Sequence, residues 1–235
     1  FQVVAMSATL NDMEHVGRLW AGESVRIISA DDPREIEMDN LSVPEGKIQD
    51  TAGDIARVIH DYIEASQLSK VLVFANKRND AHMLGLSLHE IFKATRWPVY
   101  LHFGILEAAE RDRIEHEMKN GRYGICVATS TLELGIDIGD IETIILLSPP
   151  PSVSSFLQRI GRGNRRSGTC RVVTLVRDDS ERILYHALLE LARAGKLEPV
   201  HEYIRPSVAF QQVTSLAWRG LRTDKPLSEK NTAQR

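Results

Sequence analysis

The stretch QRIGRGNRR, residues 158–166, holds the densest group of candidate chemical residues in the chain. It contains four arginines and two glycines, although the formal net charge of the whole chain is −3. Forked guanidinium donors match phosphate or carboxylate oxygens, and glycine permits close approach of a backbone or ligand. On a helix, Gln158, Arg162 and Arg165 would form one stripe suited to a polyphosphate during phosphoryl transfer. The stretch alone fits a solvated basic helix or a nonspecific nucleic-acid patch equally well.

A second group of polar side chains lies in VATSTLELGIDIGD, residues 127–140. Three hydroxyl side chains follow the apolar run that begins it: Thr129, Ser130 and Thr131. Ser130 and Glu133 have capping-box spacing, which predicts a short helix whose first amides bind a nucleic-acid backbone phosphate. Gly135 allows a turn that presents Asp137, a carboxylate able to accept from a ribose hydroxyl or to hold an arginine. By itself the pattern also fits a capped helix after a strand, which any α/β protein contains.

The elements that position these groups alternate along the chain. Amphipathic spacing predicts helices, and β-branched apolar runs predict strands. The expected helices are 53–66, 79–93, 107–119, a short arginine-rich one near 153–165, and 180–194; the expected strands are 70–75, 99–103, 124–129, 143–148 and 171–176. This order predicts an α/β fold with a parallel sheet covered by helices on both faces. Ligands of such sheets bind beyond the carboxyl ends of the strands, where NKR (76–78), HFG (102–104) and TST (129–131) fall.

Composition divides the chain into three parts. It opens at Phe1 on FQVVAM, a strand-like run with nothing before it to pair with, so we expect a piece of a longer protein. The charged and proline-rich stretch 29–47 is interpreted as a linker between domains. We expect the end of a first domain and the linker in 1–37, the α/β domain in 38–198, and the start of an accessory domain with a polar tail in 199–235.

Composition also excludes some classes of protein. The 235 residues are 43% hydrophobic and 26% charged, as in ordinary globular domains. No apolar run approaches the roughly 18 residues of a membrane span, and no secretory leader is present, which favours a cytoplasmic protein without a membrane partner. Cys126 and Cys170 lack metal-ligand spacing and are expected as reduced core thiols, so no metal site is predicted. The near-neutral charge excludes a uniform basic coat but allows a local basic groove.

Five stretches occur in an order that resembles motifs III to VI of superfamily 2 helicases of the DEAD/DEAH type. They are SAT (7–9), VFANKR (73–78), LHFGIL (101–106) with Arg111, ATSTLELGID (128–137) and QRIGRGNRR (158–166), within residues 1 to about 180. The phrases TSTLELGIDIGD and SVAFQQVTSLAWRG look most like the large helicase-related, or Lhr, family. The resemblance implies that 38–198 is the second RecA-like (helicase C-terminal) domain and that 199–221 opens a winged-helix domain.

The resemblance also implies roles for single residues. Arg162 and Arg165 match arginine fingers that reach the γ-phosphate of ATP bound by the other lobe, and Gln158 matches a residue that senses the same phosphate. Gly135 and Asp137 match the nucleotide-facing end of motif V. Positions near the phosphates of the translocating strand are matched by Asn76, Lys77, Arg78, Arg111, Thr129, Ser130 and Thr131.

Two further features bear on the mechanism that the resemblance implies. Ser7 and Thr9 match the element that couples hydrolysis to strand movement. The family has two consecutive histidines where this chain has His102 and Phe103, so no strand contact is assigned to Phe103. The chain contains neither a G-x-x-x-x-G-K-[ST] loop nor an acidic magnesium-binding box. ATP and Mg²⁺ are therefore expected mostly on the N-terminal RecA-like lobe, which is the expected partner of this one.

These features together predict the C-terminal lobe of an Lhr-like ATP-dependent helicase that acts on single-stranded or partly duplex nucleic acid, DNA favoured over RNA. The lobe alone is expected to lack ATPase activity. For an Lhr-like protein we expect a nucleoid-associated role in the bacterial or archaeal cytoplasm, such as DNA repair. The alternatives are a Ski-type RNA helicase lobe and a nucleic-acid-binding regulatory module that has lost hydrolysis. A small-molecule enzyme on a doubly wound fold would need a G-x-G-x-x-G turn after a strand, which the chain lacks.

Overall fold

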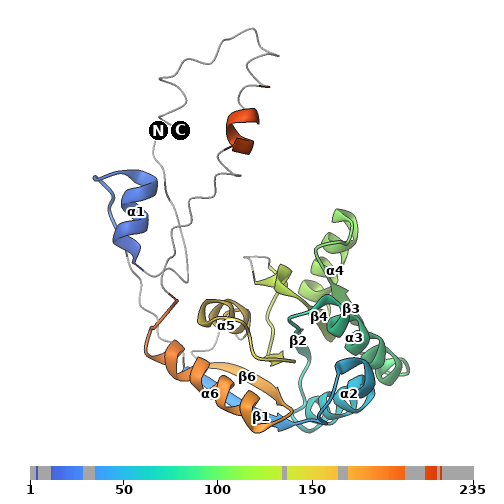
Figure 1. Ribbon diagram of the computed structural model, residues 1–235. Helices are drawn as coiled ribbons and strands as arrows, with labels where there is room; N and C mark the ends of the chain where they lie inside the picture. The colour runs from blue at the N-terminus through green and yellow to red at the C-terminus, as the bar shows by residue number, and fades with distance from the viewer. Residues whose placement is uncertain are drawn as a thin grey trace. The chain divides into compact units, whose positions relative to one another are not determined.

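The computed structural model describes residues 4, 12–28, 35–133, 137–163, 169–198, 210–215 and 218. The chain divides into two compact units, residues 1–198 and 199–235, and each is considered by itself. The first unit contains the sheet and its helices (Figure 1). In the second unit residues 210–215 are helical, and Phe210, Val213 and Trp218 are exposed. Most of the expected winged-helix opening, 199–221, lies outside the described residues.

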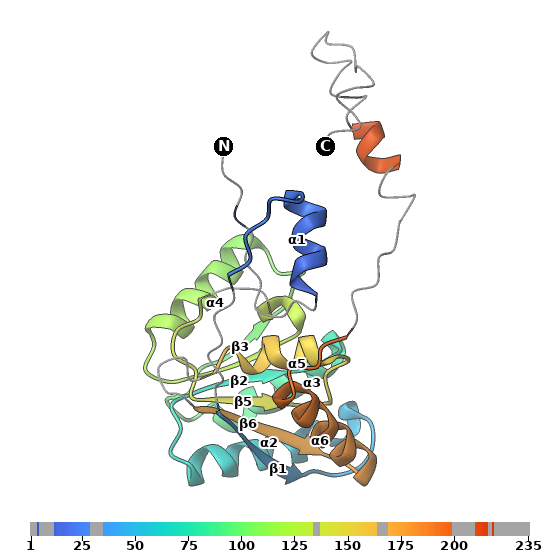
Figure 2. The same ribbon diagram turned by 90° about the vertical axis from the view of Figure 1, so that its left-hand side faces the viewer.

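Six parallel strands form one sheet in the order β1-β6-β5-β2-β4-β3. The strands are β1 Glu35–Ser42, β2 Lys70–Phe74, β3 Val99–His102, β4 Gly124–Ala128, β5 Thr143–Leu146 and β6 Thr169–Val176. The helices are α1 Met13–Ala21, α2 Ile48–Ala65, α3 Arg78–Phe92, α4 Ala108–Asn120, α5 Val153–Ile160 and α6 Asp179–Arg193, with a 3₁₀ turn, η1, at Ser130–Leu132. In Figure 2 the labelled strands β3, β2, β5, β6 and β1 follow one another in this order across the sheet, and β4 pairs with both β2 and β3. Because all strands run the same way, their carboxyl ends meet at one edge.

Each face of the sheet has its own apolar core. Successive side chains of a strand point to opposite faces, so Val71 and Val73 of β2 belong to one core and Leu72 and Phe74 to the other. Helices α2 and α3 close the first core, and α4, α5 and α6 close the second. The expectation of a parallel sheet covered on both faces is confirmed.

Strand β1 corrects the interpretation of 29–47 as a linker. Residues 35–42 form an edge strand that pairs with β6 along its whole length, from Glu35 opposite Thr169 to Ser42 opposite Val176. Ile36 and Met38 pack against the second core, while the charged residues Glu35, Glu37 and Asp39 stay exposed. The charges that suggested a linker are those of a strand at the sheet edge, where charge also discourages pairing with another chain.

Helix α5 is shorter than the expected helix near 153–165. It ends at Ile160, with Gly161 as its C-cap, so Arg162 lies in the turn that follows. Gly163 then forms a β-bridge with Ile141, and a Cβ at this position would lie 2.9 Å from Ile144 Cγ1. The chain therefore leaves the helix in order to pass close to β5, which agrees with the expectation that glycines here serve close approach. The stripe of one helix face does not extend to Arg162.

The two cysteines are buried free thiols, as expected. Burial raises the pKa of the Cys126 thiol to about 12, with a smaller contribution from the charge of Glu115, so this thiol is neutral near pH 7. Cys170 donates a hydrogen bond from Sγ to the carbonyl oxygen of Ile160 at 3.0 Å. In the described part of the chain, no helix has both the length and the apolar composition of a membrane span.

Candidate functional site

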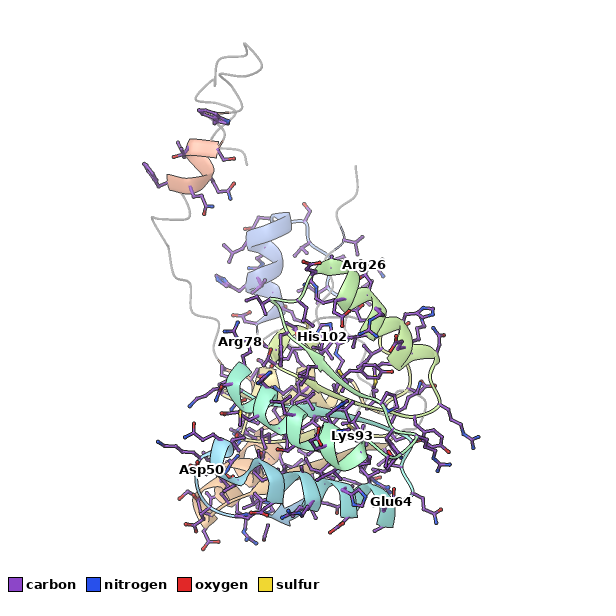
Figure 3. The ribbon with its side chains drawn as sticks, turned by 90° about the vertical axis from the view of Figure 1, so that its right-hand side faces the viewer. Arg26, Asp50, Glu64, Arg78, Lys93 and His102 are labelled. Atoms are coloured by element: carbon purple, nitrogen blue, oxygen red, sulfur yellow. The ribbon has the colours of Figure 1, made fainter. Side chains whose placement is uncertain are left out.

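Three loops meet at the carboxyl edge of the central strands. Phe74, at the end of β2, lies opposite Ala128 of β4 and Leu146 of β5, so the residues that follow these strands are neighbours. The loops carry the predicted site residues 76–78 and 129–131, and also Pro149. Figure 3 shows Arg78 at the start of α3 and Lys93 at its other end. The expectation that these loops lie at one edge of the sheet is confirmed, and their contact with phosphates stays a prediction.

A buried carboxylate joins these loops to α5. Glu133, just after η1, accepts hydrogen bonds from Arg159 Nε at 2.8 Å and from Ser155 Oγ at 3.0 Å. Arg159 Nη1 donates to Asn76 Oδ1 at 2.8 Å, and the guanidinium carbon lies 5.4 Å from the centre of the Phe74 ring. The side chains of Arg159 and Glu133 are only 3% and 13% exposed, so solvent screens this ion pair little. We call Glu133, Arg159, Asn76 and Ser155 the Glu133 junction.

The Glu133 junction replaces the capping box that the sequence predicted. A short helical turn does follow β4, but Thr129 is its N-cap and no side chain caps it. The carboxylate of Glu133 turns instead to Arg159 and Ser155. A buried guanidinium without a carboxylate would be strongly destabilising, and this outweighs one local cap.

Asn76 links three parts of the protein at this edge, where the sequence predicted a contact with a nucleic-acid strand. Its Oδ1 accepts from Arg159, and its Nδ2 donates to the carbonyl oxygen of Pro149 at 2.8 Å. The amide thereby links the loop after β2 to α5 and to the loop after β5. Lys77 and Arg78, the next two residues, are exposed at the start of α3. All three residues of NKR are exposed, and Asn76 differs from the two cations in that its amide is bound within the protein.

Arg162 is held close to the Glu133 junction by the backbone of Glu133. Arg162 is 8% exposed, and its Nη2 donates to the backbone carbonyl oxygen of Glu133. Gln158 is half-buried on α5, one turn before. Gln158 and Arg162 therefore lie on one segment, Gln158 on α5 and Arg162 in the turn after it. Four other predicted site residues lie outside the described residues: Ser7, Thr9, Gly135 and Arg165.

The hydroxyl of Thr131 belongs to a buried network with His102 and Glu115. His102 is fully buried, with Nδ1 2.9 Å from Thr131 Oγ1 and Nε2 3.2 Å from Glu115 Oε1. Thr131 Oγ1 also lies in donor geometry 3.2 Å from the His102 carbonyl oxygen. Thr131 has one hydroxyl proton, and it goes to Nδ1 in one tautomer and to the carbonyl in the other. No proton then remains for a phosphate oxygen, which offers acceptors only.

Of the three hydroxyl residues, Ser130 is exposed, whereas Thr129 and Thr131 are both half-buried. Thr129 is the N-cap of the 3₁₀ turn, and Ser130 is the first residue of that turn. The first N–H groups of a helical turn have no partners within it. Ser130 is therefore the residue of TST most open to solvent, and the phosphate site expected there stays a prediction.

Asp137 and Arg111 stand near α4. Asp137 Oδ2 accepts from Lys119 Nζ at 2.6 Å, and its Oδ1 accepts from the Gly139 N–H at 3.2 Å. The side chains of Lys119 and Asp137 are 52% and 57% exposed, so solvent weakens this pair and a ligand could compete for the carboxylate. Asp137 thus holds a lysine in this structure, whereas the sequence suggested a ribose hydroxyl or an arginine as its partner. Arg111 is half-exposed in the first turns of α4.

Several residues of the site were not predicted from the sequence. Arg159 was given no role of its own within QRIGRGNRR, and Ser155, Glu115 and Glu198 were not singled out. Glu198 binds the start of α5: its carboxylate accepts from the N–H groups of Val153 and Ser154. Burial opposes ionisation of Glu198, but these hydrogen bonds outweigh it and lower the pKa of the carboxyl. Among the described residues, no cluster of three or more His, Cys, Asp or Glu side chains could hold a metal ion.

Comparison with known proteins gives consistent relatives. Residues 54–167 match the helicase conserved C-terminal domain. The chain is 28% identical to the ATP-dependent helicase Lhr-Core of Saccharolobus solfataricus and 30% identical to that of Sulfolobus acidocaldarius, over 91% and 86% of its length. It spans about a quarter of those proteins, 25% and 24%. The structure of Mycobacterium smegmatis helicase Lhr bound to ssDNA and AMP-PNP matches with a TM-score of 0.74 and 27% identity, over 88% of this chain and 28% of that one. The fold is therefore RecA-like, and the resemblance to Lhr helicases is confirmed.

Proposed function

We propose that this chain is the second RecA-like lobe of an Lhr-like ATP-dependent helicase of superfamily 2. The match of residues 54–167 to the helicase conserved C-terminal domain supports the proposal. The observation that carries the proposal is the position of Arg162. Its guanidinium is held at the carboxyl edge by the Glu133 carbonyl, next to the loops that bear the candidate phosphate contacts. One short segment thus joins the nucleotide-facing arginine to the surface that faces the nucleic acid.

The residues of this lobe fit a contribution to an ATP site. Arg162 and Arg165 supply forked donors for the γ-phosphate, and Gln158 supplies an amide donor from the preceding turn. A guanidinium has five N–H donors, so the bond from Arg162 to the Glu133 carbonyl is compatible with a second bond to phosphate. Bound ATP provides the phosphoryl group that is transferred to water. Gly135 and Asp137 face the nucleotide in this proposal, with Asp137 released from Lys119.

Magnesium has no fitting cluster among the described residues, and no step is assigned to it on this lobe. We assign the phosphate cradle and the Mg²⁺ ligands to the N-terminal RecA-like lobe of the same protein. Closure of the lobes would bring Arg162 and Arg165 to the charge that develops on the γ-phosphate. Arginines used in this way raise hydrolysis rates by about 10³–10⁵.

The nucleic-acid strand lies across the same edge in this proposal. Lys77, Arg78 and Arg111 supply cations, and Ser130 and Thr129 supply hydroxyl and backbone donors for phosphates. Asn76 and Thr131 support these groups, because side-chain atoms of both are hydrogen-bonded within the protein. Contacts of this kind read the backbone, so affinity should depend strongly on salt and weakly on sequence. Ser7 and Thr9 remain our candidates for coupling the two lobes.

The direct test measures ATP hydrolysis by the full-length protein with and without nucleic acid. We expect stimulation by single-stranded DNA above that by single-stranded RNA. Arg162→Ala should abolish hydrolysis and leave strand affinity within about twofold of wild type. Stronger stimulation by RNA would instead support a Ski-type lobe.

A second candidate function is a nucleic-acid-binding regulatory module without hydrolysis. The low exposure of Arg162 favours it, since a withdrawn guanidinium serves the fold as well as a ligand. This reading expects the full-length wild-type protein to bind strands without ATP turnover. Hydrolysis that is lost in Arg162→Ala, with binding retained, excludes it.

A further inference from the structure

Helix α5 begins without an acidic residue of its own. Its first turn contains none, whereas α6 has Asp179 and Glu181 in its first turn and Asp178 as its N-cap. The first N–H groups of a helix have no partners within the helix, and the helix dipole favours negative charge beside them. Ser152 caps α5, but its Oγ accepts only from the N–H of Ser155, at 3.0 Å.

Glu198 supplies what α5 lacks, although it lies 45 residues away from Val153 in the sequence. Its Oε1 accepts from the Val153 N–H, and its Oε2 accepts from the Ser154 N–H at 3.2 Å and from Ser154 Oγ at 3.0 Å. One carboxylate therefore holds the first two N–H groups of α5 and one hydroxyl. Such a contact fixes both the position and the direction of the helix start.

Glu198 is also the last residue of the first unit, since the second unit begins at Pro199. A residue before proline avoids the helical region of backbone space, so the backbone of Glu198 has fewer conformations than it would have before another residue. At its other end, α5 leads through Gly161 directly to Arg162. One eight-residue helix therefore connects the point where the second unit is attached to the arginine of the candidate ATP site.

We infer that Glu198 is a positioning residue, which ties the second unit to α5 and so relays its movement to Arg162. The inference rests on the proposed function and adds the route by which movement of the second unit is coupled to ATP hydrolysis. When the chain after Glu198 is displaced, the Glu198 carboxylate displaces the start of α5, to which it is hydrogen-bonded. The Glu133 junction holds the middle of the same helix in place, beside Arg162.

The test uses three variants of the full-length protein. Glu198→Ala removes the carboxylate, and Glu198→Gln keeps an acceptor oxygen without the charge. The third inserts a short glycine-serine linker between Glu198 and Pro199, which leaves the carboxylate on α5 but slackens the joint. Glu190→Ala is the matched control, since Glu190 is an exposed residue of α6 whose carboxylate forms an ion pair with Arg193 on the same helix.

We expect Glu198→Ala to lower kcat for hydrolysis about tenfold, with the KM for ATP and strand affinity nearly unchanged. Glu198→Gln should recover part of that loss. The linker variant should hydrolyse ATP at close to the wild-type rate but unwind several-fold fewer base pairs per ATP. A merely structural role would leave this ratio unchanged.

Wild-type unwinding per ATP in the linker variant, or wild-type kcat in Glu198→Ala, would overturn the inference. A full-length wild-type protein without ATPase activity would instead overturn the proposed function. Equal losses in Glu190→Ala and Glu198→Ala would show that any change on this side of the lobe impairs it, which also contradicts a specific role for Glu198.

Discussion

Arg159 lies on α5 and Arg162 in the turn that follows it, and the surroundings of the two side chains differ. Arg159 is 2% exposed and bound to a carboxylate, an amide and the face of a phenyl ring. Arg162 lies past the end of α5 and donates to the backbone carbonyl oxygen of Glu133. Two arginines of one motif therefore have different surroundings. We call the buried side chains that hold the loops together, such as Arg159, the frame, and our proposal assigns Arg162 to the ATP site instead.

The largest effect should come from breaking the frame. Arg159→Met leaves the Glu133 carboxylate buried and unpaired, and should lower the free energy of unfolding by about 3–5 kcal/mol. Adding Glu133→Gln to Arg159→Met should recover much of the loss, because the unpaired charge is then gone. Urea denaturation followed by circular dichroism measures both. Equal stability of Arg159→Met and Arg162→Met would abolish the distinction between the two arginines.

The comparison extends to the hydroxyl cluster, where Thr131 belongs to the frame and Ser130 to the surface. Thr131→Val leaves buried His102 without one partner and should cost about 1–2 kcal/mol of stability, with little change in strand affinity. Ser130→Ala should do the reverse and weaken strand binding by about 1 kcal/mol, or roughly fivefold. Fluorescence anisotropy with a labelled single strand, beside urea denaturation, separates the two. A larger loss of affinity in Thr131→Val would contradict the assignment.

The exposed cations should respond to salt. Lys77→Ala and Arg78→Ala should each weaken strand binding to a similar degree for all sequences, and each should reduce the slope of log affinity against log salt by about 1. Lys93→Ala, at the other end of α3, is the control, since its side chain is 67% exposed and paired only with Glu90. Titrations at several salt concentrations give the slope. An unchanged slope in the α3-start variants would remove them from the strand path.

The smallest effect concerns Glu198 and pH. Its pKa is lowered in the folded state, so its contribution to stability is present above the unfolded value of about 4.3 and is lost as pH falls through the folded value. The difference in unfolding free energy between wild type and Glu198→Gln should stay below about 1 kcal/mol, because solvent screens an exposed carboxylate. It should shrink in acid. A difference that grows as pH falls would have the wrong sign for a carboxylate stabilised by N–H donors.

Much of the fold could be predicted because its signals are local. Strands such as 70–74 and helices such as 78–92 follow from the spacing of apolar residues within one segment. Strand β1 was missed because its alternating charges, typical of a sheet edge, resemble those of a linker. The edge that bears the site followed from the topology, since parallel strands bring their ends together.

The wiring of the site could not be predicted, because it consists of pairs far apart in the sequence. Arg159 and Glu133 are separated by 26 residues, His102 and Thr131 by 29, and Glu198 and Val153 by 45. For Glu133 the local pattern pointed to a helix cap, and the buried guanidinium outweighed it. The sequence identified which loops meet, and only the packed structure shows which side chains are used to join them.

The most direct test of the account is single-turnover hydrolysis by full-length Arg162→Lys protein bound to a single strand. Lysine keeps the positive charge but loses the forked donors that span phosphate oxygens. We expect strand affinity and unfolding free energy close to wild type, with hydrolysis slowed by at least about 10²-fold. Two results would contradict the account and show that Arg162 belongs to the frame. One is hydrolysis at the wild-type rate, and the other is a loss of hydrolysis accompanied by losses of stability and strand binding.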